Sequence, residues 1–208
     1  MGLPIAQVLA PDGRIVGEHD FTLDDLRGFH RDLVLARRID TESFALQRHG
    51  ELGLWPPMLG QEAAQIGSGR ALQPADFVGP SYREHAVSWC RGIDPAKLLG
   101  MFRGTSLGGW DPAEYNYALP AIVIGAQTLH AVGYGIGTML EGKSEAVVTY
   151  FGDGATSQGD TNEAFVWAAS YNAPVVFFCQ NNQYAISVPL ERQTKVPIAQ
   201  RAAGFGFE

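Results

Sequence analysis

Asp153, Gly154 and Asn182 are the residues whose types and spacing best suit the binding of a charged ligand. Asp153 offers a carboxylate and Asn182 an amide oxygen, and both are hard oxygen donors that suit magnesium or calcium. Gly154 allows another backbone to approach closely, and the amide groups that follow it can face a phosphate near the start of a helix. We therefore expect a metal-bound diphosphate at these residues.

Two uncharged segments with a helix between them must position these residues. Residues 147–151 are β-branched and aromatic, which is typical of a buried parallel strand, and residues 175–179 form a second such run. Between them, apolar residues at helical spacing follow a candidate cap, Asp160, with Glu163 three positions later, and Pro174 stops the helix. Strands joined by a crossover helix run parallel, so both strand ends lie on one edge of the sheet, where α/β proteins bind ligands.

Each polar residue also has an ordinary structural explanation. Asp153 could form a turn and Asn182 could cap a turn or a helix, because both residue types are common at such positions. Their joint placement at the ends of two neighbouring strands favours a ligand site over two unrelated turns.

A longer motif surrounds these residues. Residues 146–184 read AVVTYFGDGATSQGDTNEAFVWAASYNAPVVFFCQNNQY, and the 26 residues 155–180 separate GDG from NN. This spacing resembles the thiamine-diphosphate motif. The flanks YFGDGATSQGD and VVFFCQNNQYAISVPLERQT are more specific, and they resemble the α subunit of the two-chain 2-oxo acid dehydrogenase first component. Branched-chain enzymes and bacterial pyruvate-type relatives match best, and the resemblance extends from about Asp20 to the last residue.

The resemblance implies an α/β fold, the thiamine-diphosphate-binding fold, with a parallel sheet flanked by helices and a mostly helical N-terminal region. It divides the chain into residues 1–110, an N-terminal arm and helical region, and residues 111–208, the first part of the cofactor-binding domain. The later part of such a subunit, with further strands and the loop that carries the acid–base histidine, has no counterpart here. We therefore expect an incomplete sheet, no catalytic proton-transfer residue and no activity from this chain alone.

The resemblance also implies a cofactor site. Mg²⁺ is expected on Asp153, Asn182 and the backbone carbonyl of Tyr184, and Gln127 falls at a potassium-binding position. Plainer alternatives are a core role for Ile124, a helix-start role for Gln127, and a surface ion pair between Arg83 and Glu84, although an arginine fork suits bidentate phosphate contacts. The residues expected to contact thiamine diphosphate are Tyr82, Arg83, Ile124, Asp153, Gly154, Ala155, Asn182 and Tyr184.

The activity that the resemblance implies is oxidative decarboxylation of a 2-oxo acid, either pyruvate or a branched-chain acid, with acyl transfer to lipoyl. The expected partners are a β subunit in an α2β2 assembly and the lipoyl-bearing acyltransferase component. Two alternatives stay open: an acetoin dehydrogenase α chain, and a degenerate non-catalytic fragment that retains only partner binding.

Composition excludes other classes of function. The net charge of −7 and the pI near 5.2 give no basic surface for nucleic acid or an anionic membrane. The first ten residues lack a basic flank and a long apolar run, and no window approaches a membrane span, so we expect a cytoplasmic chain. Cys90 and Cys179 are far apart and outside any CxxC pattern, which predicts free thiols.

Histidines and glycines give weaker signals. None of the five histidines has metal-binding spacing, and His85, just after the Tyr-Arg pair, could lie near a substrate or be structural. Gly133, Gly135 and Gly137 lie in a helical run and indicate close helix packing, because GYGIG lacks the dinucleotide-loop spacing.

Local patterns predict the remaining elements. Asp12-Gly13 suits a small hairpin turn in an N-terminal arm, and Thr22 with Asp25 suits a capping box for a helix that reaches about Arg48. Further expected elements are helices at 61–71, 84–91, 95–102, 127–140 and 197–202, a short strand or extended piece at 77–82, a loop at 104–120 and a third strand edge at 121–124.

Overall fold

A three-stranded parallel sheet forms the centre of the computed structural model, which describes residues 6–106 and 108–207. The strands are β1 (Phe77–Gly79), β2 (Val147–Gly152) and β3 (Val175–Gln180), in the order β1-β2-β3. β2 pairs with both neighbours in parallel, with Val147 opposite Phe77 on one side and Val175 on the other. The predicted α/β fold with a parallel sheet is therefore confirmed.

The third strand lies within residues 77–82, where a short strand or extended piece was predicted, and not at residues 121–124. Residues 121–124 form an exposed loop before the next helix, and Ile122 and Val123 are 56% and 67% exposed. The strand is instead β1, whose first residue, Phe77, donates its N–H to the carbonyl of Ala146 at 2.9 Å. β-branched residues favour extended backbone, but a strand also needs a hydrogen-bonding neighbour, and residues 121–124 have none in the sheet.

The central strand is buried on both faces, as expected for a parallel sheet. Val148 and Tyr150 pack into an apolar cluster with residues of the helical region, including Val87 and Ile93. Phe151 faces the opposite way and packs against Phe165 of the crossover helix. The two cores on either side of β2 fix the position at which this strand ends, and so fix the residues that follow it.

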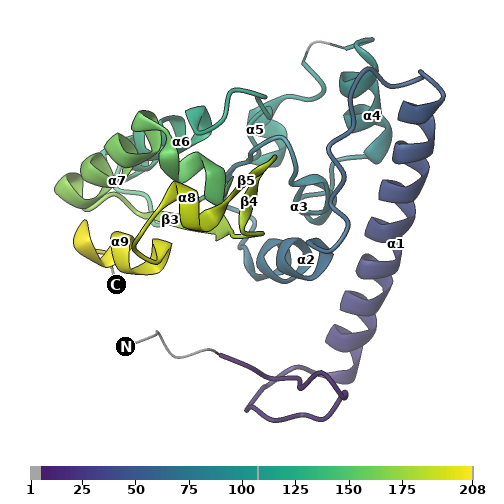
Figure 1. Cartoon of the computed structure of the whole chain (residues 1–208), viewed down its shortest axis with the longest axis horizontal. Helices are drawn as coiled ribbons and strands as arrows, with labels where there is room; N and C mark the ends of the chain where they lie inside the picture. The colour runs from purple at the N-terminus through teal and green to yellow at the C-terminus, as the bar shows by residue number, and fades with distance from the viewer. Residues whose placement is uncertain (1–5, 107, 208) are drawn as a thin grey trace.

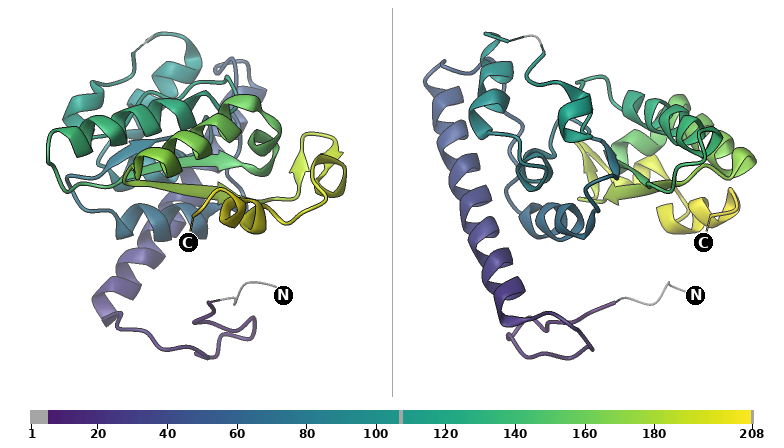
Figure 2. Two further views of the ribbon diagram at one scale, coloured as in Figure 1. Left: turned by 90° about the vertical axis from the view of Figure 1, so that its left-hand side faces the viewer. Right: turned by 180° about the vertical axis from the view of Figure 1, so that it is seen from behind.

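Helices surround the sheet (Figures 1 and 2). α6 and α7 lie side by side over one face, and α6 contacts all three strands. The helices are α1 (Leu23–Arg48), α2 (Glu62–Ala71), α3 (His85–Cys90), α4 (Pro95–Arg103), α5 (Pro112–Tyr115), α6 (Ala126–Leu140), α7 (Gly159–Tyr171), α8 (Leu190–Gln193) and α9 (Ile198–Gly204), with the short 3₁₀ helix η1 (Asp153–Ser157) after β2. None of the helices in the described ranges combines the length and apolar character that a bilayer crossing requires.

The long helix α1 stands along one side of the molecule and packs against α2 (Figure 1). Its start confirms the predicted capping box, because Thr22 Oγ1 accepts from the Asp25 N–H and the Asp25 carboxylate accepts from the Thr22 N–H. The predicted hairpin in the preceding arm is confirmed by the antiparallel bridge between Leu9 and Ile15.

Two predictions about α6 and α7 had different outcomes. Gly135 does allow close packing, because a Cβ there would lie 2.8 Å from Val175 Cγ2 on β3. A Cβ at Gly133 or Gly137 would meet no atom within 4 Å, so close packing does not explain these two glycines. Asp160 was wrongly predicted to cap α7: the helix begins at Gly159 after Gln158, without a side-chain cap. Asp160 lies in its first turn, where a negative charge interacts favourably with the positive end of the helix dipole.

Candidate functional site

A cavity of about 430 Å³ opens at the edge of the sheet where the three parallel strands end. The segments that follow β1, β2 and β3 line it, together with the loop at the start of α6. All eight residues predicted to contact the cofactor lie on its wall: Tyr82, Arg83, Ile124, Asp153, Gly154, Ala155, Asn182 and Tyr184. Segments that are up to about 100 residues apart in the chain therefore meet in one place.

Asp153 lies at the end of β2 and is only 1% exposed. Its Oδ2 accepts a hydrogen bond from Gln193 Nε2 at 3.1 Å, and the same amide nitrogen lies 3.1 Å from the Val188 carbonyl. Gln193 therefore ties the carboxylate to the segment after β3. Gln193 was not predicted as a site residue, because no local sequence pattern connects it with Asp153, 40 positions earlier.

Gly154 lets this segment approach. A Cβ at Gly154 would lie 2.8 Å from the Cβ of Ala185, which is too close for two carbon atoms. Ala185 belongs to β4 (Tyr184–Ala185), which forms a short antiparallel hairpin with β5 (Val188–Pro189). The glycine thus allows the hairpin to close over the end of β2.

Asn182 precedes this hairpin, and Tyr184 is the first residue of its first strand. Asn182 Oδ1 accepts from the Tyr184 N–H at 3.0 Å, and the Tyr184 side chain is 58% exposed. Pro189 lies opposite Tyr184 and has no N–H, so it cannot donate to the Tyr184 carbonyl. The Asn182 oxygen also keeps a second lone pair for a further ligand.

The donor set suits a hard divalent cation that shares its coordination with a ligand. No group of three or more His, Cys, Asp or Glu side chains with metal-binding geometry occurs in the part of the chain that the structure describes. One carboxylate, one amide oxygen and a backbone carbonyl nevertheless fit Mg²⁺, which commonly takes few protein ligands and completes its shell with phosphate oxygens and water.

Tyr82 and Arg83 bring the segment after β1 into the cavity wall. The Arg83 guanidinium lies over the Tyr82 ring, 5.6 Å from its centroid, and Nη1 donates to the carbonyl of Pro57. The alternative of a surface ion pair with Glu84 is wrong, because the Glu84 side chain is buried and its Oε1 accepts from Gln180 Nε2 at 2.6 Å. The remaining guanidinium donors can serve a bound anion.

Glu84 and Gln180 are site residues that the sequence analysis did not include. Both line the cavity, and Glu84 Oε2 and Gln180 Oε1 are buried without a hydrogen-bond partner in the structure. Burial raises the pKa of the Glu84 carboxyl, against smaller opposing effects of Ser81, Arg83 and Gln180. One local signal was present in the sequence. Gln180 follows the uncharged run at residues 175–179, much as Asp153 comes shortly after the run at residues 147–151.

Ile124 and Gln127 lie where the chain turns into α6. Ile124 is 42% exposed and lines the cavity, so the alternative that it belongs to the core is wrong. Gln127 is buried, and its Nε2 donates to the carbonyl of Tyr150 at 2.7 Å. Its amide thus fixes the start of α6 against β2.

His85 has a structural environment outside the cavity wall. Its ring stacks on Trp55 at 4.2 Å, its Nε2 lies 3.0 Å from the Pro56 carbonyl, and it is 5% exposed. Burial lowers the pKa of His85 to about 4, with the carbonyl of Pro56 opposing this shift. The described residues that line the cavity include no histidine, lysine or cysteine.

The two cysteines are free thiols, as predicted. Burial raises the pKa of Cys179 to about 12, with a further contribution from the nearby Asp153 carboxylate, and burial raises the pKa of Cys90 to about 11. Both thiols therefore stay protonated at neutral pH and are poor nucleophiles.

Comparison with known proteins gives a family match over most of the chain. The family described as "Dehydrogenase E1 component" matches residues 30–207. The chain is 42% identical over 206 residues to 3-methyl-2-oxobutanoate dehydrogenase subunit alpha of Mycobacterium tuberculosis, covering 97% of this chain and 56% of that protein. It is 39% identical over 205 residues to pyruvate dehydrogenase E1 component subunit alpha of Bacillus subtilis, covering 97% of this chain and 55% of that protein.

The chain thus spans a little over half the length of the curated relatives that it matches. A solved structure described as that of a thiamin diphosphate-dependent enzyme from Mycobacterium smegmatis superposes with a TM-score of 0.46 and 25% identity, over 69% of this chain and 25% of that one. The family match covers most of the sequence and includes every residue that lines the cavity. The chain therefore belongs to the dehydrogenase E1 component family.

Proposed function

We propose that this chain is the α subunit of a thiamine-diphosphate-dependent 2-oxo acid dehydrogenase, and that its cavity binds the diphosphate end of the cofactor with Mg²⁺. The observation that carries the proposal is the meeting of Arg83, Asp153 and Asn182 at the ends of three parallel strands, around one cavity. A carboxylate and an amide oxygen that suit a cation thus line the same cavity as an arginine fork that suits a diphosphate.

Each residue has a distinct role in this proposal. Asp153, Asn182 and the Tyr184 carbonyl hold Mg²⁺, while Arg83 and Tyr82 contact the diphosphate. Gly154 and Ala155 give the ligand access to the backbone at the end of β2, and Ile124 supports the thiamine ring from the loop before α6. Gln127 is the residue that we assign to a K⁺ site.

The cofactor supplies the electron sink for decarboxylation when it is bound. The chain's own residues would bind and orient the diphosphate, and the buried carboxylate of Asp153 would hold the metal. As the resemblance to the family implies, we infer that the proton-transfer groups come from elsewhere in the assembled enzyme.

The proposed reaction is oxidation of pyruvate or a branched-chain 2-oxo acid with acyl transfer to lipoyl. The proposed partners are a β subunit, in an α2β2 assembly, and a lipoyl-bearing acyltransferase, and the proposed location is the cytoplasm. The identities of 42% and 39% to a branched-chain and a pyruvate dehydrogenase subunit support the two substrate classes about equally. The division of the chain at residue 110 stays a prediction.

An assay of the chain together with its β subunit tests this function. With thiamine diphosphate, Mg²⁺ and an artificial electron acceptor, we expect oxidation of pyruvate or 3-methyl-2-oxobutanoate, and the ratio of the two rates assigns the substrate class. Oxidation of acetoin in preference to both acids would assign the chain to an acetoin dehydrogenase instead. No turnover together with no cofactor binding would contradict an enzymatic role.

A further inference from the structure

The guanidinium of Arg83 depends on a loop that is distant in sequence. Arg83 Nη1 donates to the carbonyl of Pro57, and His85 Nε2 lies 3.0 Å from the carbonyl of Pro56. The main chain of Arg83 is held separately, because Gln65 Nε2 donates to the Arg83 carbonyl at 3.0 Å while Gln65 Oε1 accepts from the Ala86 N–H at 3.0 Å. The backbone of Arg83 is thus fixed by α2, and its side chain is fixed by residues 55–58.

The centre of this loop, Pro56 and Pro57, has no amide donors of its own. The carbonyls of the two prolines serve His85 and Arg83. The loop therefore needs anchors on both sides of the Pro-Pro pair.

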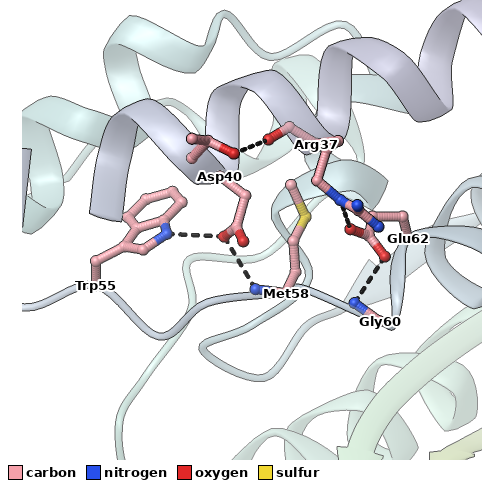
Figure 3. A network of polar contacts seen from close by, with 7 residues as sticks. Arg37, Asp40, Trp55, Met58, Gly60 and Glu62 are labelled. Carbon is pink, nitrogen blue, oxygen red and sulfur yellow. Dashed lines mark hydrogen bonds and ion pairs between the residues drawn. The ribbon is translucent and has the colours of Figure 1, made fainter. Parts of the chain in front are cut away.

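Asp40 of α1 provides both anchors with one oxygen atom. Its Oδ1 accepts from Trp55 Nε1 at 2.9 Å and from the Met58 N–H at 3.0 Å, so the two hydrogen bonds bracket Pro56 and Pro57 (Figure 3). Asp40, Trp55 and Met58 are 4%, 4% and 1% exposed. Charge-assisted hydrogen bonds at a buried carboxylate are among the stronger ones in proteins.

A second contact holds the exit of the loop. Glu62 accepts from the Gly60 N–H at 2.8 Å and from Arg37 of α1 (Figure 3). Arg37 and Asp40 are three residues apart on α1. Asp40 contacts the loop at Trp55 and Met58, and Arg37 contacts its exit through Glu62. The Arg37 side chain is 56% exposed, which makes its ion pair the weaker of the two contacts.

We propose that Asp40 is a positioning residue for Arg83: it fixes residues 55–58 so that the Pro57 carbonyl holds the guanidinium toward the cavity. This inference rests on the proposed function, in which Arg83 contacts the diphosphate. A helix that does not line the cavity thereby sets the orientation of a residue that does. The effect of Asp40 on cofactor affinity must then pass through Arg83 and disappear when the guanidinium is removed.

Asp32 provides a matched control on the same helix. It is 1% exposed, and like Asp40 it accepts a hydrogen bond from a tryptophan, Trp89 Nε1, at 3.2 Å. Its other oxygen accepts from Arg70 Nε at 2.7 Å. Its partners belong to α2 and α3 and not to residues 55–58, so its loss should lower stability without acting on the Arg83 side chain.

The experiment is a double-mutant cycle in cofactor binding. Calorimetry with thiamine diphosphate at saturating Mg²⁺, on the chain in complex with its β subunit, compares Asp40→Leu, Arg83→Ala and the double variant. We expect Asp40→Leu to weaken binding about tenfold, because small displacements of binding groups are costly. The double variant should bind no more weakly than Arg83→Ala, because one variant acts through the other. Asp40→Asn should restore near-normal affinity, because its amide oxygen can accept both hydrogen bonds.

Three results would overturn the proposal: additive losses in the double variant, an Asp32→Leu variant that weakens binding as much as Asp40→Leu, or an Arg83→Ala variant with normal affinity. If Asp40→Leu does not fold, Trp55→Phe removes one of the two donors and keeps an aromatic ring against His85. Its loss of affinity should likewise vanish in the Arg83→Ala background, and persistence would overturn the proposal. Asp153→Ala tests the proposed function separately, because Asp153 has no part in the loop contacts.

Discussion

Gln180 at the end of β3 donates a 2.6 Å hydrogen bond to Glu84, the residue that follows the Tyr-Arg pair after β1. The two residues are 96 positions apart and meet across the carboxyl end of β2. Both side chains are at least 90% buried, so this hydrogen bond joins the two outer strands of the sheet beneath the proposed diphosphate site.

Gln180→Leu is expected to destabilise the chain by about 1–3 kcal/mol, because it leaves the Glu84 carboxyl buried without this donor. Urea denaturation followed by circular dichroism measures the change. Gln200→Leu, at an exposed position on α9, is the control and should change stability by less than about 0.5 kcal/mol. Equal effects of the two substitutions would show that the Glu84 contact contributes nothing to stability.

The His85 environment predicts a pH dependence of stability. The folded chain keeps His85 neutral down to about pH 4, whereas an unfolded histidine takes up a proton near pH 6.5. The unfolded state therefore binds more protons between these values, and stability falls as the pH is lowered from 6.5 to 4, by up to about 3 kcal/mol. His85→Phe preserves the stack on Trp55 and should flatten this part of the profile.

Denaturation midpoints from pH 7 to pH 4 test that expectation. His130→Gln is the control, because His130 is exposed on α6 and should leave the slope unchanged. A His85→Phe profile as steep as that of the unmodified chain would show that other groups cause the loss.

Gly154→Ala should disturb the site more than the fold. The new Cβ would meet Ala185, so the β4–β5 hairpin must shift, at a cost of about 1–3 kcal/mol. We expect weaker Mg²⁺-dependent binding of thiamine diphosphate, because Asn182 and Tyr184 move with the hairpin. Gly159→Ala, where a Cβ meets no atom within 4 Å, should bind normally. A Gly154→Ala variant with unchanged affinity would contradict the close approach of the hairpin.

The sequence predicted most of the parts that local chemistry determines. The Thr22–Asp25 capping box and the two strands that flank the GDG and NN motifs depend on residues that are near each other in the chain, and all were found. β1 was predicted as a short strand or extended piece, but its place in the sheet depends on pairing with β2, about 70 residues later. Local pattern alone made residues 121–124 an equally good strand.

In the site, too, the residues placed by local pattern and topology were predicted, and those placed by long-range packing were not. Asp153 and Asn182 could be placed together because crossover topology brings parallel strand ends to one edge. Gln193 contacts Asp153 across 40 residues and Gln180 contacts Glu84 across 96 residues, and no local turn or strand pattern joins residues so far apart in the chain. Tertiary packing alone creates those contacts.

Exposed apolar residues before and on α6 predict association. Ile122, Val123 and Tyr134 are 56%, 67% and 40% exposed, and they lie before and on α6. We expect the chain to self-associate or to form a stable complex with a β subunit through these residues. Val123→Lys should shift sedimentation velocity profiles toward the monomer, whereas Val34→Lys, on the exposed side of α1, should not. A compact monomer that ignores the β subunit would contradict the prediction.

The central claim is that Asp153 holds the metal of a bound diphosphate. Isothermal calorimetry of thiamine diphosphate, with and without Mg²⁺, on the chain in complex with its β subunit tests it most directly. We predict Mg²⁺-dependent binding that Asp153→Ala weakens by about 3–5 kcal/mol, the typical effect of removing one partner of a buried charge pair. Asp160→Ala, exposed in the first turn of α7, should bind like the unmodified chain. Unchanged affinity in a folded Asp153→Ala variant would contradict the account.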